Sequence, residues 1–320
     1  MEIVVADIGG THARFALAEI GGGRVVALGE PVVMRAADHA SLQTAWEAFA
    51  AGRTLPRAAA IAVACPVQGE VLKLTNNPWV IRPHLIPEKL NVDRFVLCND
   101  FTAVAHTVAQ AEPMYFRHLC GPDGPLPEHG AISVVGPGTG LGVALLVRRA
   151  DAYQVVPTEG GHVDFAPLDS IEDAILARLR ARFRRVSVER VVAGPGLVDI
   201  YEALAALEGR TVSPIDDKTL WAAALAGDDS LAAAALDRFC LSLGAVTGDI
   251  ALHQGAGGVV IAGGLGLRLA DDLPRSGFAT RFVAKGRFEA MMAAIPVKLL
   301  THPQPGLYGA AAAFAQEHGE

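Results

Sequence analysis

Three glycine-rich turns carry the residues best suited to bind an anion. They are Gly9-Gly10-Thr11, the run from Gly136 to Gly142, and Gly263-Gly264 within a third turn. Such a turn lets backbone N–H groups approach a phosphate, because no side chain blocks them and φ can be positive. One turn is a weak indication, since glycine-rich hairpin turns are common, but three together favour a phosphate-binding function.

Two familiar nucleotide-binding motifs do not fit these turns. The pattern G-x-G-x-x-G fails because Leu141 and Leu269 stand where its third glycine would be, and the chain has no G-K-S/T triplet. A dinucleotide-binding motif and a Walker motif are therefore both excluded. Asp7, just before the first turn, could instead hold Mg²⁺ through water, since magnesium prefers one or two carboxylates together with substrate phosphates.

The segments that must position these turns alternate between predicted strands and helices. Short apolar runs predict strands, whereas an apolar stripe or a capping residue predicts a helix. Such alternation is typical of a largely parallel or mixed α/β sheet. The predicted strands are 3–6, 14–18, 59–64, 95–98, two within 131–147, 258–262 and 297–300, and the predicted helices are 41–51, 170–185 and 308–316.

The first two turns belong to hairpins of the same plan. Aligning Asp7 with Gly136 brings Gly9 onto Gly138, with apolar runs on both sides of each turn. This correspondence predicts an internal duplication of a β-hairpin. The uncharged stretch 131–147 is nearly long enough to cross a bilayer, but glycines in its middle would break a helix, so two buried strands fit it better.

The stretch from Ser170 to Arg185 has apolar residues four apart on one face and several arginines mostly on the other. Arginines invite a phosphate-binding interpretation. A charged stripe opposite an apolar stripe is usually just solvated, however, so the stretch is predicted to be an amphipathic surface helix.

Length, charge and cysteine content exclude several classes of protein. A chain of 320 residues is roughly twice the usual domain size, which predicts two lobes. The formal net charge of -7 means that the chain has no excess of positive charge to attract nucleic acid or an anionic membrane, so a small-molecule partner is expected. Four well-separated cysteines and a start that lacks the pattern of a signal peptide predict a cytoplasmic protein with reduced thiols.

The three turns, in this order, resemble the superfamily of actin, Hsp70 and the sugar kinases, whose members place two phosphate hairpins around a nucleotide and a glycine pair against its adenosine. Within that superfamily the chain is similar to the bacterial glucokinases, from its first strand to Gly309. The most specific matching segments are Cys98 to Ala103, Glu159 to Pro167 and Ser187 to Val191.

This resemblance implies an ATP-dependent kinase of glucose with the two-lobed, actin-like (ribonuclease H-like) α/β fold. The fold has a duplicated mixed sheet with flanking helices and an active site in the cleft between the lobes. Residues 1–110 with 302–320 are expected to form a small N-terminal lobe, and residues 111–301 a large lobe. A homodimer is also implied.

The resemblance further implies a role for each site residue. Asp100 would be the base that accepts the proton of the attacking sugar hydroxyl. A carboxylate near its reference pKa of about 3.9 is ionised at neutral pH and suited to that task. The implied sugar-binding residues are Asn99, Asp100, Glu159, His162 and Glu189; the implied ATP-binding residues are Ala6, Asp7, Ile8, Gly9, Gly10, Thr11, Gly138, Thr139, Gly140, Gly263 and Gly264, with Asp7 also serving Mg²⁺.

Each of these polar residues also has an ordinary structural interpretation. Asn99-Asp100 after a strand is most often a helix N-cap, and Glu189 could simply be an acidic residue in the first turn of a helix. Their joint occurrence in the order of the family favours the functional interpretation. The loop Thr75 to Trp79 also resembles a family loop near the sugar, but Asn-rich turns beside proline are common, so it is not included in the site.

Two departures from related sequences affect the cofactors. His12 stands where many related kinases carry Asn, which places an imidazole near the predicted phosphates. A broader branch of related kinases and repressors has a cysteine cluster after the corresponding His and binds structural zinc. Here Val163, Asp164 and Phe165 follow His162, so no zinc is expected.

Three alternatives stay open at the level of sequence. The substrate could be another hexose or an N-acyl hexosamine, because that choice depends on the space around one hydroxyl. A sugar-responsive repressor of the same fold would need a DNA-reading domain, usually an N-terminal helix-turn-helix, and the chain starts directly in a predicted strand. An actin-like assembly protein would keep the nucleotide turns but have no use for the polyol-binding residues.

Overall fold

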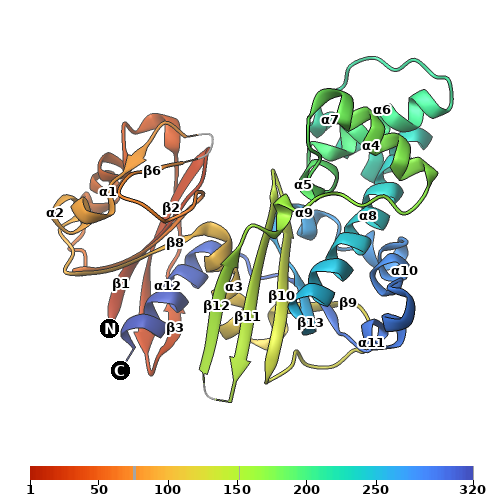
Figure 1. Ribbon diagram of the computed structural model, residues 1–320. Helices are drawn as coiled ribbons and strands as arrows, with labels where there is room; N and C mark the ends of the chain where they lie inside the picture. Colours follow the sequence, from red (N-terminus) through yellow and green to blue (C-terminus); the bar gives the residue numbers. More distant parts are fainter. Residues whose placement is uncertain (75–76, 151, 320) are drawn as a thin grey trace. The chain divides into compact units, whose positions relative to one another are not determined.

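The computed structural model describes residues 1–74, 77–150 and 152–319, and it divides into two compact units (Figure 1). Unit 1 comprises Met1–Glu112, Val155–Pro157 and His302–Glu320. Unit 2 comprises Pro113–Gln154 and Thr158–Thr301. Each unit has its own β-sheet and its own hydrophobic core.

Unit 1 is built on a mixed sheet of six strands in the order β3-β2-β1-β5-β8, with β4 paired to β2. β1 runs antiparallel to β2 and parallel to β5, and β5 runs parallel to β8. A two-stranded ribbon joins β6 to β7. The strands are β1 (Glu2–Ile8), β2 (His12–Gly21), β3 (Arg24–Leu28), β4 (Val32–Arg35), β5 (Ala58–Val63), β6 (Leu72–Lys73), β7 (Val80–Ile81) and β8 (Arg94–Asn99), and the α-helices are α1 (Leu42–Ala50), α2 (Ile86–Leu90), α3 (Asp100–Gln110) and α12 (Pro305–His318).

Helices cover both faces of this sheet, which explains why its central strands are apolar without interruption. Side chains alternate across a strand, so Val4 and Ala6 of β1 pack in one cluster with Trp46 of α1, whereas Ile3 and Val5 pack in another with α12. All six residues of β5 are buried. A sheet covered on both faces is typical of parallel α/β architecture.

Unit 2 contains a second mixed sheet of six strands, in the order β12-β11-β10-β13-β14-β9. β10 runs antiparallel to β11 and parallel to β13, which runs parallel to β14. The strands are β9 (Phe116–Cys120), β10 (Gly130–Pro137), β11 (Leu141–Arg149), β12 (Ala152–Thr158), β13 (Ala256–Ile261) and β14 (Val297–Leu300), and the α-helices are α4 (Ser170–Arg182), α5 (Val188–Val192), α6 (Gly196–Leu207), α7 (Asp217–Ala226), α8 (Ser230–Gln254), α9 (Gly263–Arg268), α10 (Phe278–Val283) and α11 (Glu289–Ala293).

The two sheets repeat one plan, which confirms the predicted duplication. Strands β3-β2-β1-β5-β8 and β12-β11-β10-β13-β14 follow the same order, with an antiparallel hairpin beside parallel strands in each. The hairpin turns have equal length, because Gly9 to Thr11 joins β1 to β2 and Gly138 to Gly140 joins β10 to β11. The predicted α/β fold with a duplicated mixed sheet is therefore correct.

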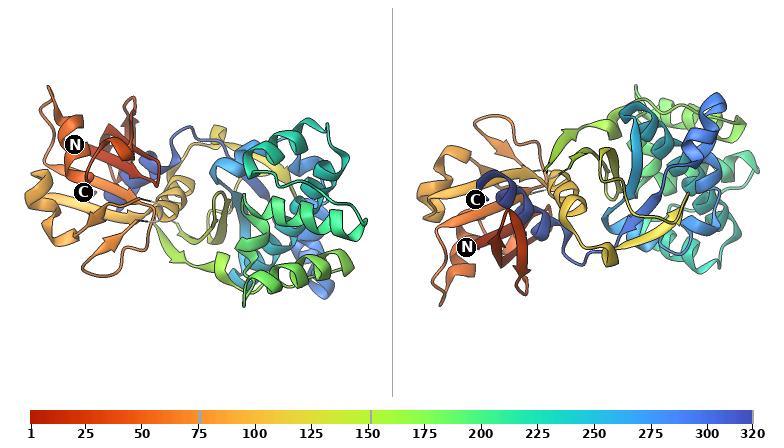
Figure 2. Two further views of the ribbon diagram at one scale, coloured as in Figure 1. Left: turned by 90° about the horizontal axis from the view of Figure 1, so that it is seen from above. Right: turned by 90° about the horizontal axis from the view of Figure 1, so that it is seen from below.

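Helix α8 is the central helix of unit 2 and packs against α6, α7 and α10, a helical group visible in both views of Figure 2. By length and composition it could cross a membrane, yet 72% of its most apolar window is buried inside the protein. It is therefore a core helix. The uncharged stretch 131–147 forms parts of β10 and β11, as predicted.

Gly309 allows α12 to pack closely on α3, and this contact yields a stability prediction. A Cβ atom at Gly309 would lie 1.7 Å from the carbonyl oxygen of Ala103, so the helices would have to separate. Gly309→Ala should lower the free energy of unfolding by about 3 kcal/mol, measured by urea unfolding.

Gly124→Ala is the matched control, because a Cβ there meets no described atom within 4 Å. It should change the free energy of unfolding by less than about 0.5 kcal/mol. Equal stability of the two variants would contradict the close helix contact.

Candidate functional site

The first glycine turn is held in place by its own backbone and by a buried amide. The N–H of Gly9 donates to the carbonyl of His12 at 2.9 Å, and the side-chain amide of Asn77 donates to the carbonyl of Gly9 at 3.2 Å. Asn77 in turn accepts from the N–H of Trp79 at 2.9 Å. Sequence analysis left this loop out of the site; of its residues, Thr75 and Asn76 lie outside the described part of the chain.

Asp7 lies at the end of β1, against the first turn of α12. A Cβ on Gly306 would fall 2.6 Å from an Asp7 carboxylate oxygen, so this close approach requires glycine. Arg14 forms an ion pair with Asp7 at 3.3 Å. Burial nevertheless raises the pKa of Asp7 above its ordinary value, although the charge of Arg14 opposes this effect. A bound cation would therefore stabilise the carboxylate.

Asn99 and Asp100 join β8 to α3, and both take part in capping that helix. Asn99 accepts from the N–H groups of Phe101 and Thr102, at 2.9 and 3.3 Å, and its amide donates to the carbonyl of Cys65 at 3.3 Å. One carboxylate oxygen of Asp100 accepts from the N–H of Phe101 at 2.7 Å. The capping interpretation of Asn99-Asp100 is thus correct as a description of local structure.

The pKa of Asp100 is raised to about 6, chiefly because burial disfavours its charged form. The negative charge of Asp7 adds to this increase, while the hydrogen bond from the N–H of Phe101 opposes it. The expectation of a pKa near 3.9 was wrong, because sequence does not reveal how strongly the end of a strand is desolvated. Asp100 still ionises below neutral pH.

Asp7 and Asp100 come together because parallel strands end at one edge of the sheet of unit 1. Ile8 pairs with Val63, and Val63 pairs with Asn99, so the three strand ends are in register. This is the edge at which ligands bind in α/β sheets. Unit 1 therefore presents two carboxylates and a glycine turn side by side.

The second glycine turn is the point where several segments of unit 2 meet. Within the turn, the N–H of Gly138 donates to the carbonyl of Gly140 at 2.8 Å, and from outside it the N–H of Gly194 donates to the carbonyl of Gly138 at 2.7 Å. Glu189 accepts from the N–H of Leu141 at 2.8 Å. A Cβ on Gly140 would lie 2.5 Å from the Glu189 carboxylate. Glu189 thus contacts the second glycine turn directly, which its predicted role in sugar binding did not include.

Glu159 precedes a single 3₁₀ turn, Gly160–His162, that ends at His162 and packs on β11. The packing of this turn leaves no room for a side chain at Gly161, because a Cβ there would lie 2.2 Å from the carbonyl oxygen of Leu141. Both side chains point outward, with 74% of Glu159 and 56% of His162 exposed and 4.0 Å between their polar atoms. They are therefore available to a ligand.

Backbone pairing brings these two residues next to Glu189. The N–H of Phe165 donates to the carbonyl of Val186 at 3.0 Å, and the N–H of Val188 donates to the carbonyl of Val163 at 2.9 Å. Leu141 is contacted both by Gly161 and by Glu189. The three sugar-binding residues predicted in unit 2 therefore surround the start of β11.

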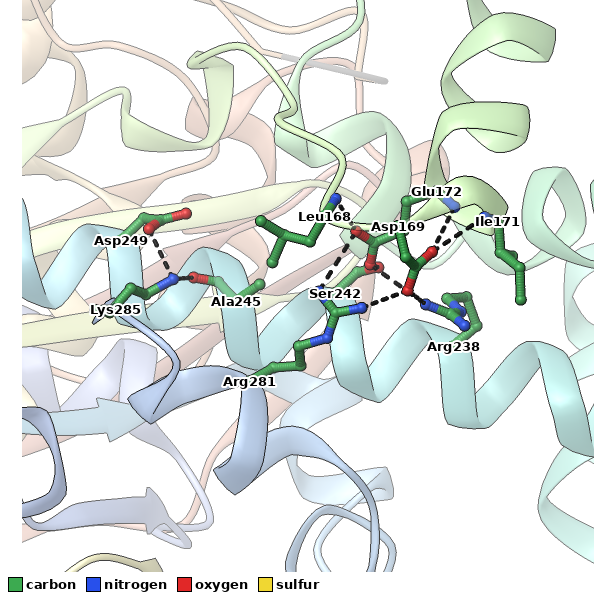
Figure 3. Close-up of polar contacts among 10 residues, drawn as sticks. All are labelled: Leu168, Asp169, Ile171, Glu172, Arg238, Ser242, Ala245, Asp249, Arg281 and Lys285. Atoms are coloured by element: carbon green, nitrogen blue, oxygen red, sulfur yellow. Dashed lines mark hydrogen bonds and ion pairs between the residues drawn. The ribbon is translucent and has the colours of Figure 1, made fainter. Parts of the chain in front are cut away.

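A network of charged side chains anchors the far end of the segment that carries His162 (Figure 3). Asp169 caps α4 and pairs with Arg238 and Arg281, at 2.5 Å each. Glu172, which is 1% exposed, accepts from the N–H of Leu168 at 2.7 Å and from the hydroxyl of Ser242 at 3.0 Å. Because both carboxylates and both guanidinium groups are partnered, the network fixes the loop before α4 to α8 and α10.

The third glycine turn lies beside the second. Gly263 has a φ of +82°, and a Cβ there would lie 3.1 Å from the carbonyl oxygen of Pro137. A Cβ on Gly264 would meet no described atom within 4 Å. The backbone at Gly264 is therefore open to a ligand, next to the turn that begins at Gly138.

A cavity of about 450 Å³ adjoins the second turn and was not foreseen from the sequence. This volume lies within the range of about 300–1,000 Å³ typical of small-molecule sites. Two arginines of α4 form ion pairs beside it, Arg182 with Asp199 and Arg178 with Glu202; both stay exposed, as predicted for the Arg-rich face, and the ion pairs were not foreseen. The lining residues are Thr139, Arg182, Phe183, Glu189, Arg190, Ala193, Pro195, Gly196, Val198, Asp199, Glu202 and Asp217.

Acidic, histidine and cysteine side chains do not form a metal-binding group of three anywhere in residues 1–74, 77–150 and 152–319. A magnesium ion would therefore depend on Asp7 together with substrate phosphates and water, which is the coordination that Mg²⁺ prefers. The raised pKa of Asp7 is consistent with such a cation. The absence of zinc stays a prediction.

Comparison with known proteins gives one consistent result. The family model described as glucokinase matches residues 4–317. The chain is 64% identical over 322 residues to the glucokinase of Zymomonas mobilis, covering 100% of this chain and 99% of that protein, and 42% identical to the glucokinase of Paramagnetospirillum magneticum, covering 97% and 96%.

Solved structures agree with the sequence relatives. A glucokinase from an Antarctic psychrotroph superposes with a TM-score of 0.85 at 33% identity, covering 98% of each chain. Glucokinase from Balamuthia mandrillaris in complex with glucose has a TM-score of 0.78 at 21% identity, covering 98% of this chain and 93% of that one, which supports the fold alone.

The raised pKa of Asp100 makes stability depend on pH. Between about 3.9, the value in an unfolded chain, and about 6, the folded protein binds more protons than the unfolded chain. The stabilising contribution of Asp100 to the free energy of unfolding is therefore complete below about pH 4 and lost as the pH rises through about 6. As the pH rises from about 4 to about 8, the free energy of unfolding of Asp100→Asn, measured by urea unfolding, should increase by about 1–2 kcal/mol relative to that of the parent.

Asp38→Asn, at an exposed position of unit 1, is the control for removing one carboxylate. The difference in unfolding free energy between Asp38→Asn and the parent should be the same at about pH 4 and at about pH 8. A pH-independent difference for Asp100→Asn as well would show that Asp100 is not desolvated.

Proposed function

Because the chain belongs to the glucokinase family, we propose that it transfers the γ-phosphoryl group of ATP to the 6-hydroxyl of glucose, giving glucose 6-phosphate and ADP, with Asp100 as the base. The observation that carries the proposal for the site is the pairing of Asp100 with a phosphate-binding turn at one sheet edge of unit 1. Activity as an ATP-dependent hexose kinase follows from family membership, whereas the role of each residue is our inference.

Asp100 has the chemistry that the attacking hydroxyl needs. One of its oxygens accepts from the N–H of Phe101, and the other would accept from the sugar hydroxyl. Phosphoryl transfer depends mainly on positioning and on neutralising charge, with a carboxylate accepting the hydroxyl proton. The capping bonds of Asn99 and Asp100 fix the orientation of that carboxylate before the substrate arrives.

Glucose would be bound by Asn99, Asp100, Glu159, His162 and Glu189. Carboxylates and amides are strong hydrogen-bonding partners for hydroxyl groups. The exposure of Glu159 and His162, and their position beside Glu189 at the start of β11, support this assignment within unit 2.

The nucleotide phosphates would lie on backbone N–H groups of the turns Gly9 to Thr11 and Gly138 to Gly140, with the adenosine against Gly263-Gly264. These turns are free of bulky side chains, and their geometry is fixed by outside hydrogen bonds. Asp7 would hold Mg²⁺ through water, and the ion would supply charge neutralisation at the phosphates. Ala6 and Ile8 would contribute backbone at the end of β1.

Three features rest on the resemblance alone and belong to the proposal. They are a cytoplasmic location, a homodimeric state and a preference for glucose over other hexoses and N-acyl hexosamines. Light scattering coupled to size exclusion would test the dimer. A coupled assay over several hexoses would test the preference.

Asp100→Asn should lower kcat by about 10² or more, because Asn keeps the shape of the carboxylate but does not accept the proton. The KM for glucose should change by less than about threefold, since the hydrogen bond to Phe101 can be retained. A coupled assay for ADP formation measures both constants. Near-normal turnover would reject Asp100 as the base.

The parent enzyme should lose kcat/KM for glucose as the pH falls through about 6, because protonation blocks the base. A profile that stays flat to about pH 5 would contradict a base with this raised pKa.

Glu189→Gln should raise the KM for glucose about tenfold or more, because a hydrogen bond to a charged acceptor is stronger than one to an amide. Glu289→Gln, at an exposed position of unit 2, removes the same charge and should leave this KM unchanged. If both variants behave alike in steady-state assays, Glu189 does not contact the sugar.

A further inference from the structure

The cavity beside the second turn is lined by an arginine that pairs with no carboxylate in the described part of the chain. Arg190 follows Glu189 on α5 and lines the cavity together with Thr139. Within the described residues, its side chain makes no ion pair and no hydrogen bond. The other arginine in the lining, Arg182, is committed to Asp199.

An aromatic ring holds the guanidinium of Arg190 in place. Its central carbon lies 4.1 Å from the centre of the Phe183 ring, close enough for a cation–π contact. Stacking on a ring leaves the N–H groups at the edge of the guanidinium free to donate. Arg190 is therefore a positioned cation with unused donors, unlike an arginine that extends freely into water.

The carboxylates of the lining do not compete for Arg190. Asp199 and Glu202 are paired with Arg182 and Arg178, and Glu189 accepts from the N–H of Leu141. Asp217 is at the first turn of α7, where a negative charge is stabilised by the helix. The cavity thus combines two ion pairs with the carboxylates of Glu189 and Asp217 and one arginine, Arg190, that forms no described ion pair, next to the second glycine turn.

We propose that Arg190 binds a phosphate group of the nucleotide whose phosphates lie on the turn Gly138 to Gly140. This inference rests on the proposed function, since it requires the nucleotide to bind at that turn. Guanidinium groups match phosphate geometry through paired N–H donors, which makes arginine the favoured residue for this contact. Arg190 binds the nucleotide, whereas Glu189, its neighbour in sequence, binds the sugar.

The first test compares Arg190→Gln with Arg180→Gln in steady-state assays. Arg180 is an exposed arginine of α4 outside the cavity lining, so the two variants lose the same charge. Arg190→Gln should raise the KM for MgATP about tenfold, while the KM for glucose and the Tm change little. Arg180→Gln should match the parent. Identical behaviour of the two variants, or an equal rise in both KM values, would overturn the proposal.

The second test identifies the group that Arg190 contacts, by calorimetric titration of four ligands into the parent and Arg190→Gln. ADP and ATP should bind about tenfold more weakly to the variant, whereas adenosine and glucose 6-phosphate should bind equally to both proteins. Equal weakening of adenosine would show a contact with the nucleoside, and weakening of glucose 6-phosphate alone would show a contact with the product. Either result overturns the proposal.

Thr139→Val separates this inference from the proposed function. If Thr139→Val weakens ADP binding and Arg190→Gln does not, the nucleotide lies on the turn and only the role of Arg190 is wrong. If neither variant affects ADP, the placement of the nucleotide at this turn fails as well.

Discussion

The close approach of Glu189, Gly194 and Gly263 to one three-residue turn is the constraint on which the organisation of unit 2 depends. Gly138 to Gly140 is contacted by Gly194 through a backbone hydrogen bond and by the carboxylate of Glu189, while Gly263 lies against the strand just before it. Any side chain at Gly140 or Gly263 would occupy the space of these contacts. The glycines therefore serve packing and ligand access at once, and the residues that contact the turn are brought together by the same geometry.

Unit 1 repeats the hairpin but supports it differently. Its turn is held by the amide of Asn77, and the helix that approaches it is α12, through Gly306 against Asp7. Duplication has thus conserved the order of strands and the length of the turn, while the supporting contacts have diverged. This divergence allows one turn to lie next to the acid pair Asp7 and Asp100, and the other to lie next to Glu189 and a cavity.

The sequence predicted those parts of the structure that depend on local patterns. Uninterrupted apolar runs located β1, β5 and β10, and Ser41 and Asn99 located the starts of α1 and α3, because capping is a local interaction. Helices α6, α7 and α8 were not predicted; α7 and α8 have alanine-rich sequences that are apolar on several faces and show little periodicity. The ion pairs of Arg178 and Arg182, the support from Asn77 and the cavity all depend on contacts between distant segments. The sequence Asn77-Pro78-Trp79 was the one local pattern that indicated a role for Asn77 near the site.

Asn99 and Asp100 show why a structural and a functional interpretation of the same residues need not compete. Capping uses the acceptor oxygen of Asn99 and one oxygen of Asp100, and it thereby fixes both side chains at the edge of the sheet. The carboxyl group of Asp100 is desolvated and lies near Asp7, so its ionisation is disfavoured. The capping hydrogen bonds offset part of that electrostatic cost, because they favour the charged form. A base that is fixed by its helix and only partly desolvated can be ionised at neutral pH and still bind protons more readily than an exposed carboxylate.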